Sequence, residues 1–406
     1  MKIAVIGAGA SGIMSAIIAA KNGAQVTLIE KNDRIGKKIL ATGNGKCNFT
    51  NKTISSADYN SQDSDFYSDY ISQFDNYDVI SFFENMGMLI KDRNGYCYPR
   101  SEQASTVLDL LRLQLKQLNV EILTESYPLS IQKKKKDFEI LLNNQKKLFF
   151  QRVILTCGSF AGEKKPIEPS GYTLAKQLGH HLVPIVPALV QLRCSNKDFK
   201  SIAGVRCDAN IRLFVDNILV KEEYGELQLT DYGLSGIPIF QLSRFASYAI
   251  YHKKETYAII DLIVDKEMDS LVSYAQNKWK SIDKNCTLEE YFQGLLNKKL
   301  NLFFIKNAGF KPETPLHKIR FTNIIHILET MKSWKVTITN TNPVENAQIC
   351  AGGVSMDEIS LKMESKLVPG LYFAGEMLDI DARCGGYNLQ WAWTSGYLAG
   401  KYASIS

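Results

Sequence analysis

The chain has 406 residues, which is long enough for two or three domains and for a hydrophobic core that needs no disulfide bonds. Its composition, with 45% hydrophobic and 22% charged residues, is that of an ordinary soluble globular protein, and its net charge of +6 would suit an anionic ligand. The eight cysteines contain no Cys-x-x-Cys pair, which excludes the usual zinc site and the usual dithiol redox pair.

The N-terminal residues look at first like a secretion signal, because Lys2 precedes a largely apolar run. Three glycines interrupt that run at fixed spacing and strand-like residues follow it, so we interpret it as folded protein. No stretch reaches the roughly 20 uninterrupted apolar residues of a membrane span. We therefore expect a cytoplasmic enzyme that binds no membrane, and in that compartment the sequon at Asn48 is not glycosylated.

A βαβ unit is predicted at the start of the chain, with a strand over 2–6, a helix over 10–22 and a second strand over 25–30. The strand and the helix are joined by IGAGASG, a G-x-G-x-x-G motif at Gly7, Gly9 and Gly12. In this context the three glycines allow a tight turn, close backbone approach to a pyrophosphate, and close helix-on-strand packing. The helix N-terminus then offers N–H groups to the phosphates.

Glu30 ends the second strand, where a carboxylate accepts hydrogen bonds from adenosine ribose hydroxyls and disfavours the extra phosphate of NADP. The expected ligand therefore has an AMP half with free ribose hydroxyls. Up to this point the residues do not separate NAD from FAD.

The next segment, RIGKKILATGNGKCNFTN (34–51), could be a phosphate loop, a redox or metal site, or a glycosylated surface loop. Gly45-Lys46 resembles the end of a P-loop, but Leu40 stands where that motif has glycine, and Cys47 replaces its Ser or Thr. Nucleotide hydrolysis is therefore excluded. The position just after Glu30 favours a second segment along the dinucleotide.

Further elements are predicted from periodicity and turn residues: helices over 79–90 and from Ser101 or Ser105 to about 118, and strands over 120–123, 128–132, 138–142 and 148–156. The last strand ends in ILTCGSFAG, whose Gly158 would let the chain return close to the dinucleotide. Beyond it we predict short strands over 189–220, a strand followed by a glycine-rich loop over 225–236, and helices over 269–308 and 323–334. This middle region has no second G-x-G-x-x-G, so no separate nicotinamide-binding domain is predicted.

Near the C-terminus a strand is predicted over 371–374, running into Gly375-Glu376, and Gly385-Gly386 opens a helix over about 388–402. Trp391 and Trp393 are two residues apart, so they point in different directions from this helix. Core packing is favoured for at least one of them.

Five segments together resemble one bacterial family, the YhiN/BaiN-like FAD-dependent oxidoreductases, which include aminoacetone oxidase and a bile-acid reductase. The segments are IGAGASG, GKKILATGNGKCNFTN, GELQLTDYGLSG, AGGVSMDEI and LYFAGEMLDIDARCGGYNLQWAWTSG. The resemblance implies an α/β fold in which both chain ends form a Rossmann-like FAD-binding domain (1–187 and 347–406). It also implies an inserted β-rich domain (188–262, with a return strand at 334–346) and a helical domain (263–333).

The resemblance and the motifs together predict a non-covalent FAD site, with Lys37 and Lys38 flanking the pyrophosphate and Thr42 to Asn48 along the ribityl chain and ring. Glu376 would bind the ribityl or phosphate region, and the N–H groups of Asn388 and Leu389 would point at the flavin ring. The predicted cofactor-binding residues are Gly7, Gly9, Ala10, Ser11, Gly12, Glu30, Lys31, Lys37, Lys38, Thr42, Gly43, Asn44, Gly45, Cys47, Asn48, Pro128, Cys157, Gly158, Gly375, Glu376, Gly386, Asn388 and Leu389.

Two departures from the family pattern affect the chemistry. Asp231 stands where many relatives have a histidine, and we interpret it as a loop residue rather than an acid or base. The segment EKKPIEPSGYTLA (163–175) lacks the longer glycine-rich pattern of relatives. Cys47 and Cys384 are interpreted as small residues beside the cofactor, and His180 and His181 as residues of a helix end. No acid or base is assigned, and no metal is predicted.

The expected function is that of an FAD-dependent oxidoreductase that passes a hydride or two electrons between a small organic substrate and NAD(P)(H) or oxygen. Any NAD(P)H would dock transiently over the flavin. Two alternatives are a flavoprotein that binds or modifies RNA and a non-catalytic FAD redox sensor. RNA binding is not expected, because the sequence has no arginine-rich run.

Overall fold

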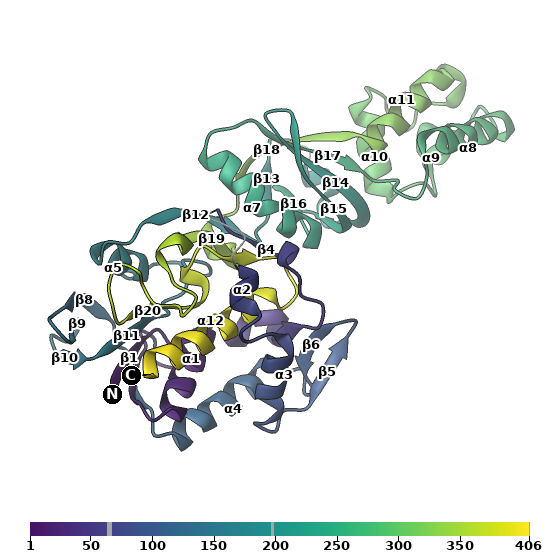
Figure 1. The fold of residues 1–406 in the computed structure, drawn as a ribbon. Coiled ribbons are helices and arrows are strands. Elements are labelled where there is room, and N and C mark those ends of the chain that lie inside the picture. Colours follow the sequence, from purple (N-terminus) through teal and green to yellow (C-terminus); the bar gives the residue numbers. More distant parts are fainter. Residues whose placement is uncertain (63–66, 196–198, 406) are drawn as a thin grey trace. The chain divides into compact units, whose positions relative to one another are not determined.

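The computed structural model describes residues 1–62, 67–195 and 199–405, and the chain forms two compact units (Figure 1). One unit consists of residues 1–185 and 349–406, and the other of residues 186–348. The predicted boundaries after residues 187 and 346 lie close to these divisions.

The first unit is built on a parallel sheet with the strand order β20-β11-β1-β2-β7. Ile6 lies opposite both Ile29 and Leu155, so the carboxyl ends of the three central strands meet at one edge. The α/β prediction is thereby confirmed. The strands are β1 (Lys2–Ile6), β2 (Gln25–Ile29), β7 (Glu121–Leu123), β11 (Arg152–Leu155) and β20 (Leu371–Phe373).

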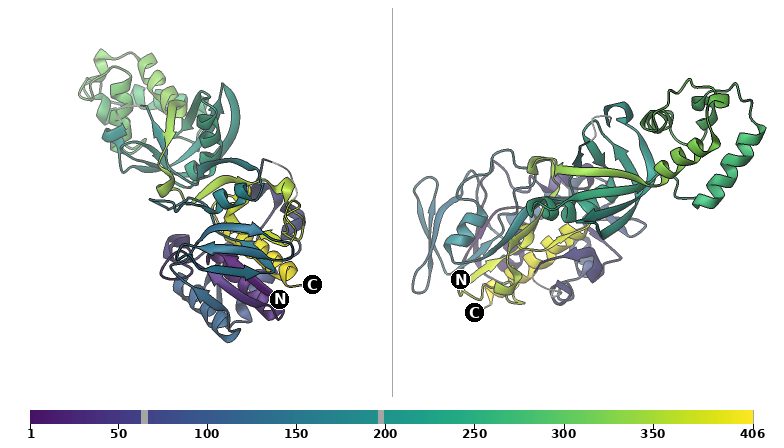
Figure 2. Two further views of the ribbon diagram at one scale, coloured as in Figure 1. Left: turned by 90° about the vertical axis from the view of Figure 1, so that its left-hand side faces the viewer. Right: turned by 90° about the horizontal axis from the view of Figure 1, so that it is seen from above.

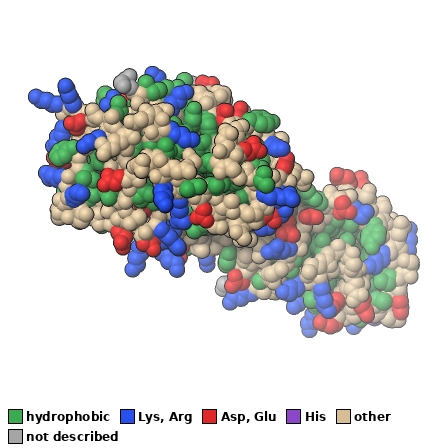
Figure 3. Space-filling view, turned by 90° about the horizontal axis from the view of Figure 1, so that it is seen from below, with side chains coloured by type: hydrophobic (Ala, Val, Ile, Leu, Met, Phe, Trp, Pro, Cys, Tyr) green, Lys and Arg blue, Asp and Glu red, His purple; other side chains and the backbone are tan. Residues whose placement is uncertain are grey.

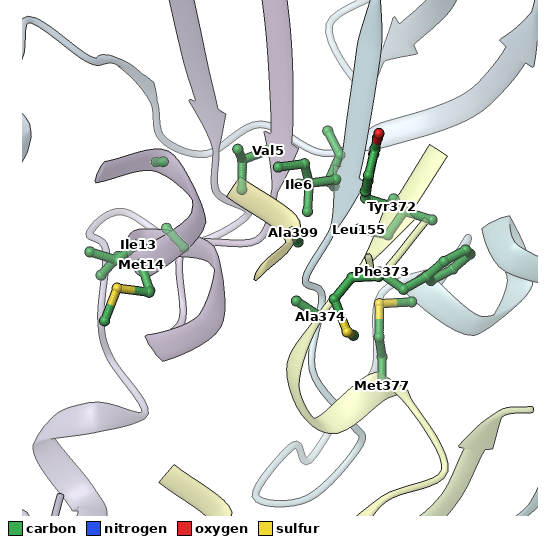
Figure 4. Close-up of a cluster of buried hydrophobic side chains, with 14 of the residues drawn as sticks. Val5, Ile6, Ile13, Met14, Leu155, Tyr372, Phe373, Ala374, Met377 and Ala399 are labelled. Atoms are coloured by element: carbon green, nitrogen blue, oxygen red, sulfur yellow. The ribbon is translucent and has the colours of Figure 1, made fainter. Parts of the chain in front are cut away.

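Two helices from opposite ends of the chain, α1 (Ala10–Lys21) and α12 (Tyr387–Ser404), run side by side against this sheet (Figure 1 and Figure 2). Small residues allow the close approach, since a Cβ added to Gly396 would lie 2.5 Å from the Ser11 carbonyl oxygen. The Ser15 hydroxyl donates to the Gly396 carbonyl at 2.9 Å. Ala399 of α12 lies in the same apolar cluster as Val5, Leu155 and Phe373 of the sheet (Figure 4).

The remaining elements of this unit form small sheets and helices around the parallel sheet. The sheets are β3-β6-β5, β10-β9-β8, β21-β4 and β12-β19. Their strands are β3 (Thr50–Asn51), β4 (Tyr59–Asn60), β5 (Ile90–Arg93), β6 (Tyr96–Pro99), β8 (Pro128–Lys133), β9 (Phe138–Leu142), β10 (Lys147–Phe150), β12 (Leu182–Ala188), β19 (Ile349–Val354) and β21 (Asp381–Ala382). The helices are α2 (Tyr67–Ile71), α3 (Asn76–Glu84), α4 (Ala104–Gln117) and α5 (Gly171–Gln177).

Three predicted boundaries were wrong. The helix predicted over 79–90 is α3, which the Asp75 side chain caps and which ends at Glu84, because Ile90 pairs with Pro99 in a hairpin. Neither Ser101 nor Ser105 caps α4, since Gln103 precedes its first residue. The strand predicted over 148–156 is two strands, because β10 pairs antiparallel with β9 whereas β11 pairs parallel with β1.

The second unit contains a closed barrel of six strands in the order β13-β16-β15-β14-β17-β18. They are β13 (Leu192–Cys194), β14 (Arg206–Val215), β15 (Ile218–Leu229), β16 (Gly233–Ser235), β17 (Thr256–Asp261) and β18 (Trp334–Thr341). The helices are α6 (Phe199–Ile202), α7 (Ile237–Tyr251), α8 (Met268–Ser281), α9 (Leu288–Phe292), α10 (Lys298–Asn307) and α11 (Phe321–Lys332). Part of the region predicted as strands, residues 196–198, lies outside the described residues.

Strands and helices of the second unit share one hydrophobic cluster. The Trp334 ring contacts the rings of Phe303 and Phe304, with centroids 5.3 and 5.6 Å apart. Trp334, predicted to end a helix, instead begins β18 and pairs with Ile260. Across both units, no helix in the described ranges has the length and apolarity that crossing a membrane requires.

Candidate cofactor site

The glycine loop between β1 and α1 is held by the protein at two of its three glycines. A Cβ on Gly12 would lie 1.9 Å from the Gly7 carbonyl oxygen, and one on Gly7 would lie 2.5 Å from the Thr156 carbonyl oxygen. Gly9 differs, because its backbone is extended (φ −80°, ψ −166°) and no atom lies within 4 Å of a Cβ placed there. The contacts of Gly7 and Gly12 account for their being glycine, whereas Gly9 faces open space of the kind a pyrophosphate needs.

Glu30 lies just beyond β2 and is buried under this loop. Its Oε2 accepts the Ala8 N–H at 2.7 Å, and its Oε1 accepts both the Asn32 backbone N–H at 2.9 Å and the Asn32 side-chain amide at 2.5 Å. A carboxylate has about four acceptor positions, so these bonds orient the group without exhausting it. Lys31 forms an ion pair with Glu163. Pro128 begins β8, and two residues before it the Ser126 N–H donates to the Glu30 carbonyl.

The segment after β2 forms an irregular turn, η1 (Ile39–Gly45), followed by a buried stretch. Gly43, Asn44 and Cys47 all have positive φ, between 55° and 56°. A positive φ at a non-glycine residue costs of order 1 kcal/mol and collects at functional sites. The turn thus brings the predicted residues Thr42 to Asn48 into one compact loop, in which the Cys47 N–H donates to the Thr42 carbonyl at 3.0 Å.

This loop continues into residues that are anchored to α12. The Trp393 Nε1–H donates to the Phe49 carbonyl at 3.0 Å, and the Thr50 hydroxyl donates to Gln390 Oε1 at 2.6 Å. Trp391, also buried, donates to the Gly375 carbonyl at 3.2 Å. Both tryptophans therefore pack in the core, which confirms the predicted packing role for at least one and extends it to the other.

Asn48 and the start of α12 lie next to each other. A Cβ on Gly386 would lie 2.7 Å from the Thr50 carbonyl oxygen and 3.0 Å from Asn48 Oδ1. That oxygen is buried and has no hydrogen-bond partner among the described residues. The first N–H groups of α12, including those of Asn388 and Leu389, have no acceptor within their own helix. The Asn388 side chain is not available, because it bonds the N–H and the carbonyl of Ala382 at 2.9 and 2.8 Å.

The two predicted lysines have different surroundings. Lys38 Nζ lies 2.6 Å from Glu376 Oε2. The other carboxylate oxygen of Glu376, Oε1, accepts the Ser159 hydroxyl at 2.5 Å and the Cys350 N–H at 3.2 Å. Lys37 Nζ lies 3.2 Å from Asp33, and both side chains are substantially exposed. Both lysine side chains are 48% exposed, so their partners distinguish them: Lys38 belongs to the polar cluster around Glu376, and Lys37 pairs with the exposed Asp33.

The ends of β11 and β20 meet the glycine loop. A Cβ on Gly375 would lie 2.3 Å from the Ser11 hydroxyl, and the Gly375 N–H donates to the Ser395 hydroxyl at 2.9 Å. The Cys157 thiol lies 3.6 Å from the Ile6 carbonyl. Ser11, Cys157 and Gly375 are thus brought together at the carboxyl edge of the sheet, with Ala10 opening α1 beside them and Gly158 following Cys157. A Cβ on Gly158 or on Gly45 would meet no atom within 4 Å.

Two residues near this edge were missed in the sequence. Ser159 bonds Glu376, and its position two residues after Cys157 in ILTCGSFAG was the only signal. Tyr172 is 3% exposed, and its hydroxyl has no partner among the described residues. An unsatisfied buried hydroxyl costs about 1 to 3 kcal/mol. Tyr172 lies in the segment that departs from the family pattern, which is why no role was predicted for it.

The histidines predicted at a helix end are held by one carboxylate. His180 Nδ1 lies 2.8 Å from Glu358, and His181 Nδ1 bonds the same group. The His180 N–H also donates to the Ala175 carbonyl of α5 at 3.1 Å. Asp231 is exposed between β15 and β16. No group of three or more metal-ligating side chains is present within 1–62, 67–195 and 199–405.

All eight cysteines are free, and burial raises the pKa of seven of them, including the two that were predicted to lie beside the cofactor. Burial raises the pKa of Cys47 to about 11 and that of Cys384 to about 12. At pH 8 only about one Cys47 thiol in a thousand is then ionised.

We expect Cys47 to resist iodoacetamide at pH 8 in the folded protein and to react in urea, as measured by mass spectrometry of its peptide. Labelling of folded protein at the rate of a free thiol would contradict this.

Comparison with known proteins places the chain in a family. The family model described as the HI0933-like protein Rossmann domain matches residues 1–402. The chain is 40% identical over 406 residues to the 3-dehydro-bile acid delta(4,6)-reductase of Clostridium scindens, covering 99% of each chain. It is 29% identical to the ribosomal RNA dihydrouridine synthase of Haemophilus influenzae, covering 97% of this chain and 96% of that one.

A solved structure agrees with the fold. The 3-ketosteroid-delta4-(5alpha)-dehydrogenase of Rhodococcus jostii RHA1 aligns with a TM-score of 0.50 at 14% identity, over 100% of this chain and 96% of that one. The family model matches nearly the whole chain, and the matched residues include the glycine loop, Glu30 after β2, α1 and nearly all of α12. The chain therefore belongs to the HI0933-like family of Rossmann-domain proteins, the YhiN/BaiN-like FAD-dependent oxidoreductases.

Proposed function

We propose that this protein is an FAD-dependent reductase that adds a hydride and a proton to a carbon–carbon double bond conjugated to a carbonyl group in a small organic molecule. The observation that carries the proposal is the 40% identity, over 99% of both chains, to a reductase whose name describes such a substrate. The geometry at the carboxyl edge of the sheet is compatible with it, because that edge is where dinucleotides bind in Rossmann domains.

The residues at this edge fit FAD. The open space at Gly9 suits the pyrophosphate, the α1 N-terminus offers its N–H groups, and Glu30 has acceptor positions for the ribose hydroxyls. Lys38, which pairs with Glu376, would lie near the phosphates. The orphan Asn48 Oδ1 and the N-terminus of α12 lie together and would face the flavin ring. The bound flavin supplies the two-electron chemistry, and the chain supplies position and charge.

The dipole of α12 gives this end of the site a function beyond binding. A helix N-terminus stabilises nearby negative charge by about 0.3 to 2 kcal/mol. Placed at the edge of the ring that gains charge on reduction, it would favour the reduced cofactor.

The electrons would come from NAD(P)H, which gives a hydride and leaves as NAD(P)+, and a solvent proton completes the reduction of the double bond. We also propose a cytoplasmic location for the protein.

The proposal is tested with purified full-length protein under anaerobic conditions. We expect a yellow protein whose flavin absorbance is bleached by NADH or NADPH and restored by a conjugated ketone such as 4-androstene-3,17-dione, with a product two mass units heavier. Saturated ketones serve as the control, because they lack the acceptor bond. Reoxidation by oxygen alone, with no heavier product from any conjugated ketone in a panel, would refute the reductase.

A second candidate is reduction of uridine in ribosomal RNA, and the observation that favours it is the similarity to the Haemophilus influenzae enzyme over 97% of this chain. The uracil ring also contains a double bond conjugated to a carbonyl, so the same chemistry would serve. Lysine and arginine side chains are interspersed with acidic ones on the face in Figure 3, which is unlike the basic stripe of an RNA-binding surface. Dihydrouridine formed by the enzyme in ribosomal RNA transcripts would establish this activity, and measurable turnover of either substrate would exclude a pure redox sensor.

The two adjacent lysines offer a matched test of the phosphate end. We expect Lys38→Ala to weaken FAD binding about tenfold, since a hydrogen bond to a charged group contributes about 1.5 kcal/mol or more. Lys37→Ala should change the affinity less than about twofold, because Lys37 pairs with the exposed Asp33 and not with Glu376. Titration of flavin fluorescence measures both, with Lys38→Arg as the control that keeps the charge. Equal losses in the two alanine variants would contradict the assignment of Lys38.

A further inference from the structure

Tyr172 is placed at the strand ends by the beginning of α5. A Cβ on Gly171 would lie 2.4 Å from the Cys157 Cβ and 3.7 Å from the Met377 Cε, so this helix begins directly against the residues that follow β11 and β20. The Tyr172 ring packs edge-on against Phe160 at 5.0 Å. The side chain is 3% exposed.

The hydroxyl of Tyr172 differs from those of other buried tyrosines. Four of these donate to backbone carbonyls: Tyr59 to Tyr387 at 3.2 Å, Tyr70 to Ile359 at 3.3 Å, Tyr291 to Ala275 at 2.7 Å and Tyr372 to Tyr402 at 3.2 Å. The Tyr172 hydroxyl has no partner among the described residues. Buried polar groups in native proteins are almost always bonded, so we infer a partner other than the described residues.

This hydroxyl carries a proton that it can donate to an acceptor. Burial, reinforced by the nearby Cys350 and Glu376, raises the pKa of Tyr172 well above its ordinary value, so the hydroxyl keeps its proton at any physiological pH. Glu376 itself is occupied by Lys38, Ser159 and the Cys350 N–H. The group is therefore a neutral hydroxyl with no acceptor among the described residues.

We propose that Tyr172 is a cofactor-binding residue whose hydroxyl donates a hydrogen bond to the phosphate–ribityl chain of bound FAD. The position of Tyr172 favours this ligand. The start of α5 lies against Cys157, which follows β11, and against Met377, which follows β20. Gly375 also follows β20, and it adjoins Ser11 of the glycine loop. Phosphate oxygens and ribityl hydroxyls are the acceptors that such a cofactor presents there. The inference rests on the proposed function, since it requires that FAD binds.

The test is Tyr172→Phe in the full-length chain, which removes the oxygen and keeps the ring. We expect the Kd for FAD to rise about tenfold, equivalent to about 1.4 kcal/mol. Without FAD the same variant should melt at the same temperature as the wild type or a few degrees higher, because an unsatisfied hydroxyl has been removed. Fluorescence titration gives the Kd, and thermal unfolding without cofactor gives Tm.

Tyr70→Phe is the matched control, because Tyr70 is also 3% exposed but donates to a protein carbonyl. It should lower Tm without cofactor and leave the FAD affinity unchanged. Wild-type FAD affinity in Tyr172→Phe would overturn the inference and leave the proposed function intact. A fall in cofactor-free Tm like that of Tyr70→Phe would also overturn it, since the hydroxyl would then have a structural partner. Failure of the wild type to bind FAD would refute both.

Discussion

Gly9→Val is expected to abolish FAD binding and leave the protein folded. Gly9 has an extended backbone that any L-residue adopts, and a Cβ there meets no atom within 4 Å, so the ligand-free chain accommodates a side chain. The valine methyl groups would instead fill the space through which the loop backbone approaches the pyrophosphate. We expect FAD affinity to fall by about 100-fold or more, equivalent to at least about 2.7 kcal/mol.

The measurement is a titration of FAD fluorescence with the purified variant, beside urea unfolding without cofactor. Gly9→Ala is the graded control, because one methyl group obstructs less than three carbon atoms and should cause a smaller loss. An unchanged urea midpoint together with lost binding supports a dinucleotide at Gly9. Wild-type FAD affinity in Gly9→Val would place the pyrophosphate elsewhere and refute the binding mode.

Gly12→Val should produce the opposite pattern, with the fold itself lost. A Cβ at this position would lie 1.9 Å from the Gly7 carbonyl oxygen and 2.6 Å from the Thr156 hydroxyl. The first of these atoms is backbone at the end of β1, so it cannot rotate away as a flexible side chain would. Overpacking a core commonly costs about 1 to 3 kcal/mol, and a contact this short with fixed backbone is expected to exceed about 3 kcal/mol.

The free energy of unfolding in urea, without FAD, measures this loss, and poor expression of soluble protein would be its first sign. Gly9→Val, three residues away in the same loop, is the matched control with the same added side chain. If Gly12→Val were as stable as the wild type, the close packing of α1 on β1 would be refuted. The two variants therefore separate a glycine needed for the fold from one needed for the ligand.

The segments that fold through neighbouring residues were predicted well. The boundaries of β1, α1 and β2 agree with prediction to within one residue, because two short apolar runs, a glycine loop and a short return to the sheet are all local in sequence. The helix after Gly386 was also predicted, and its observed start at Tyr387 is one residue early. The family resemblance further predicted that both chain ends share one domain.

Elements whose identity depends on distant partners were predicted less well. Ile90 looked like the end of a helix because its apolar neighbours have helical spacing, yet its pairing with Pro99 makes it a strand residue. Gln151 separates two strands in an apolar run because β9 pairs with the first and β1 with the second. Trp334 was placed on a helix, but its partner Ile260 holds it in the barrel.

Some of the predicted cofactor residues could be identified from local sequence, and the surroundings of others depend on distant residues. The motif at Gly7, Gly9 and Glu30 could be read from spacing alone, because its chemistry belongs to one continuous βαβ unit. The separation of Lys38 from Lys37 could not, because it depends on Glu376, more than 300 residues away in the chain.

Local sequence was thus sufficient for the dinucleotide-binding character of the protein, since three glycines and one acid within a single βαβ unit specify it. Only the folded chain distinguished Gly9, open to a ligand, from Gly12, closed against β1, although both are glycines of the same motif. It also revealed the unbonded hydroxyl of Tyr172, because whether a donor is satisfied depends on atoms from other parts of the chain.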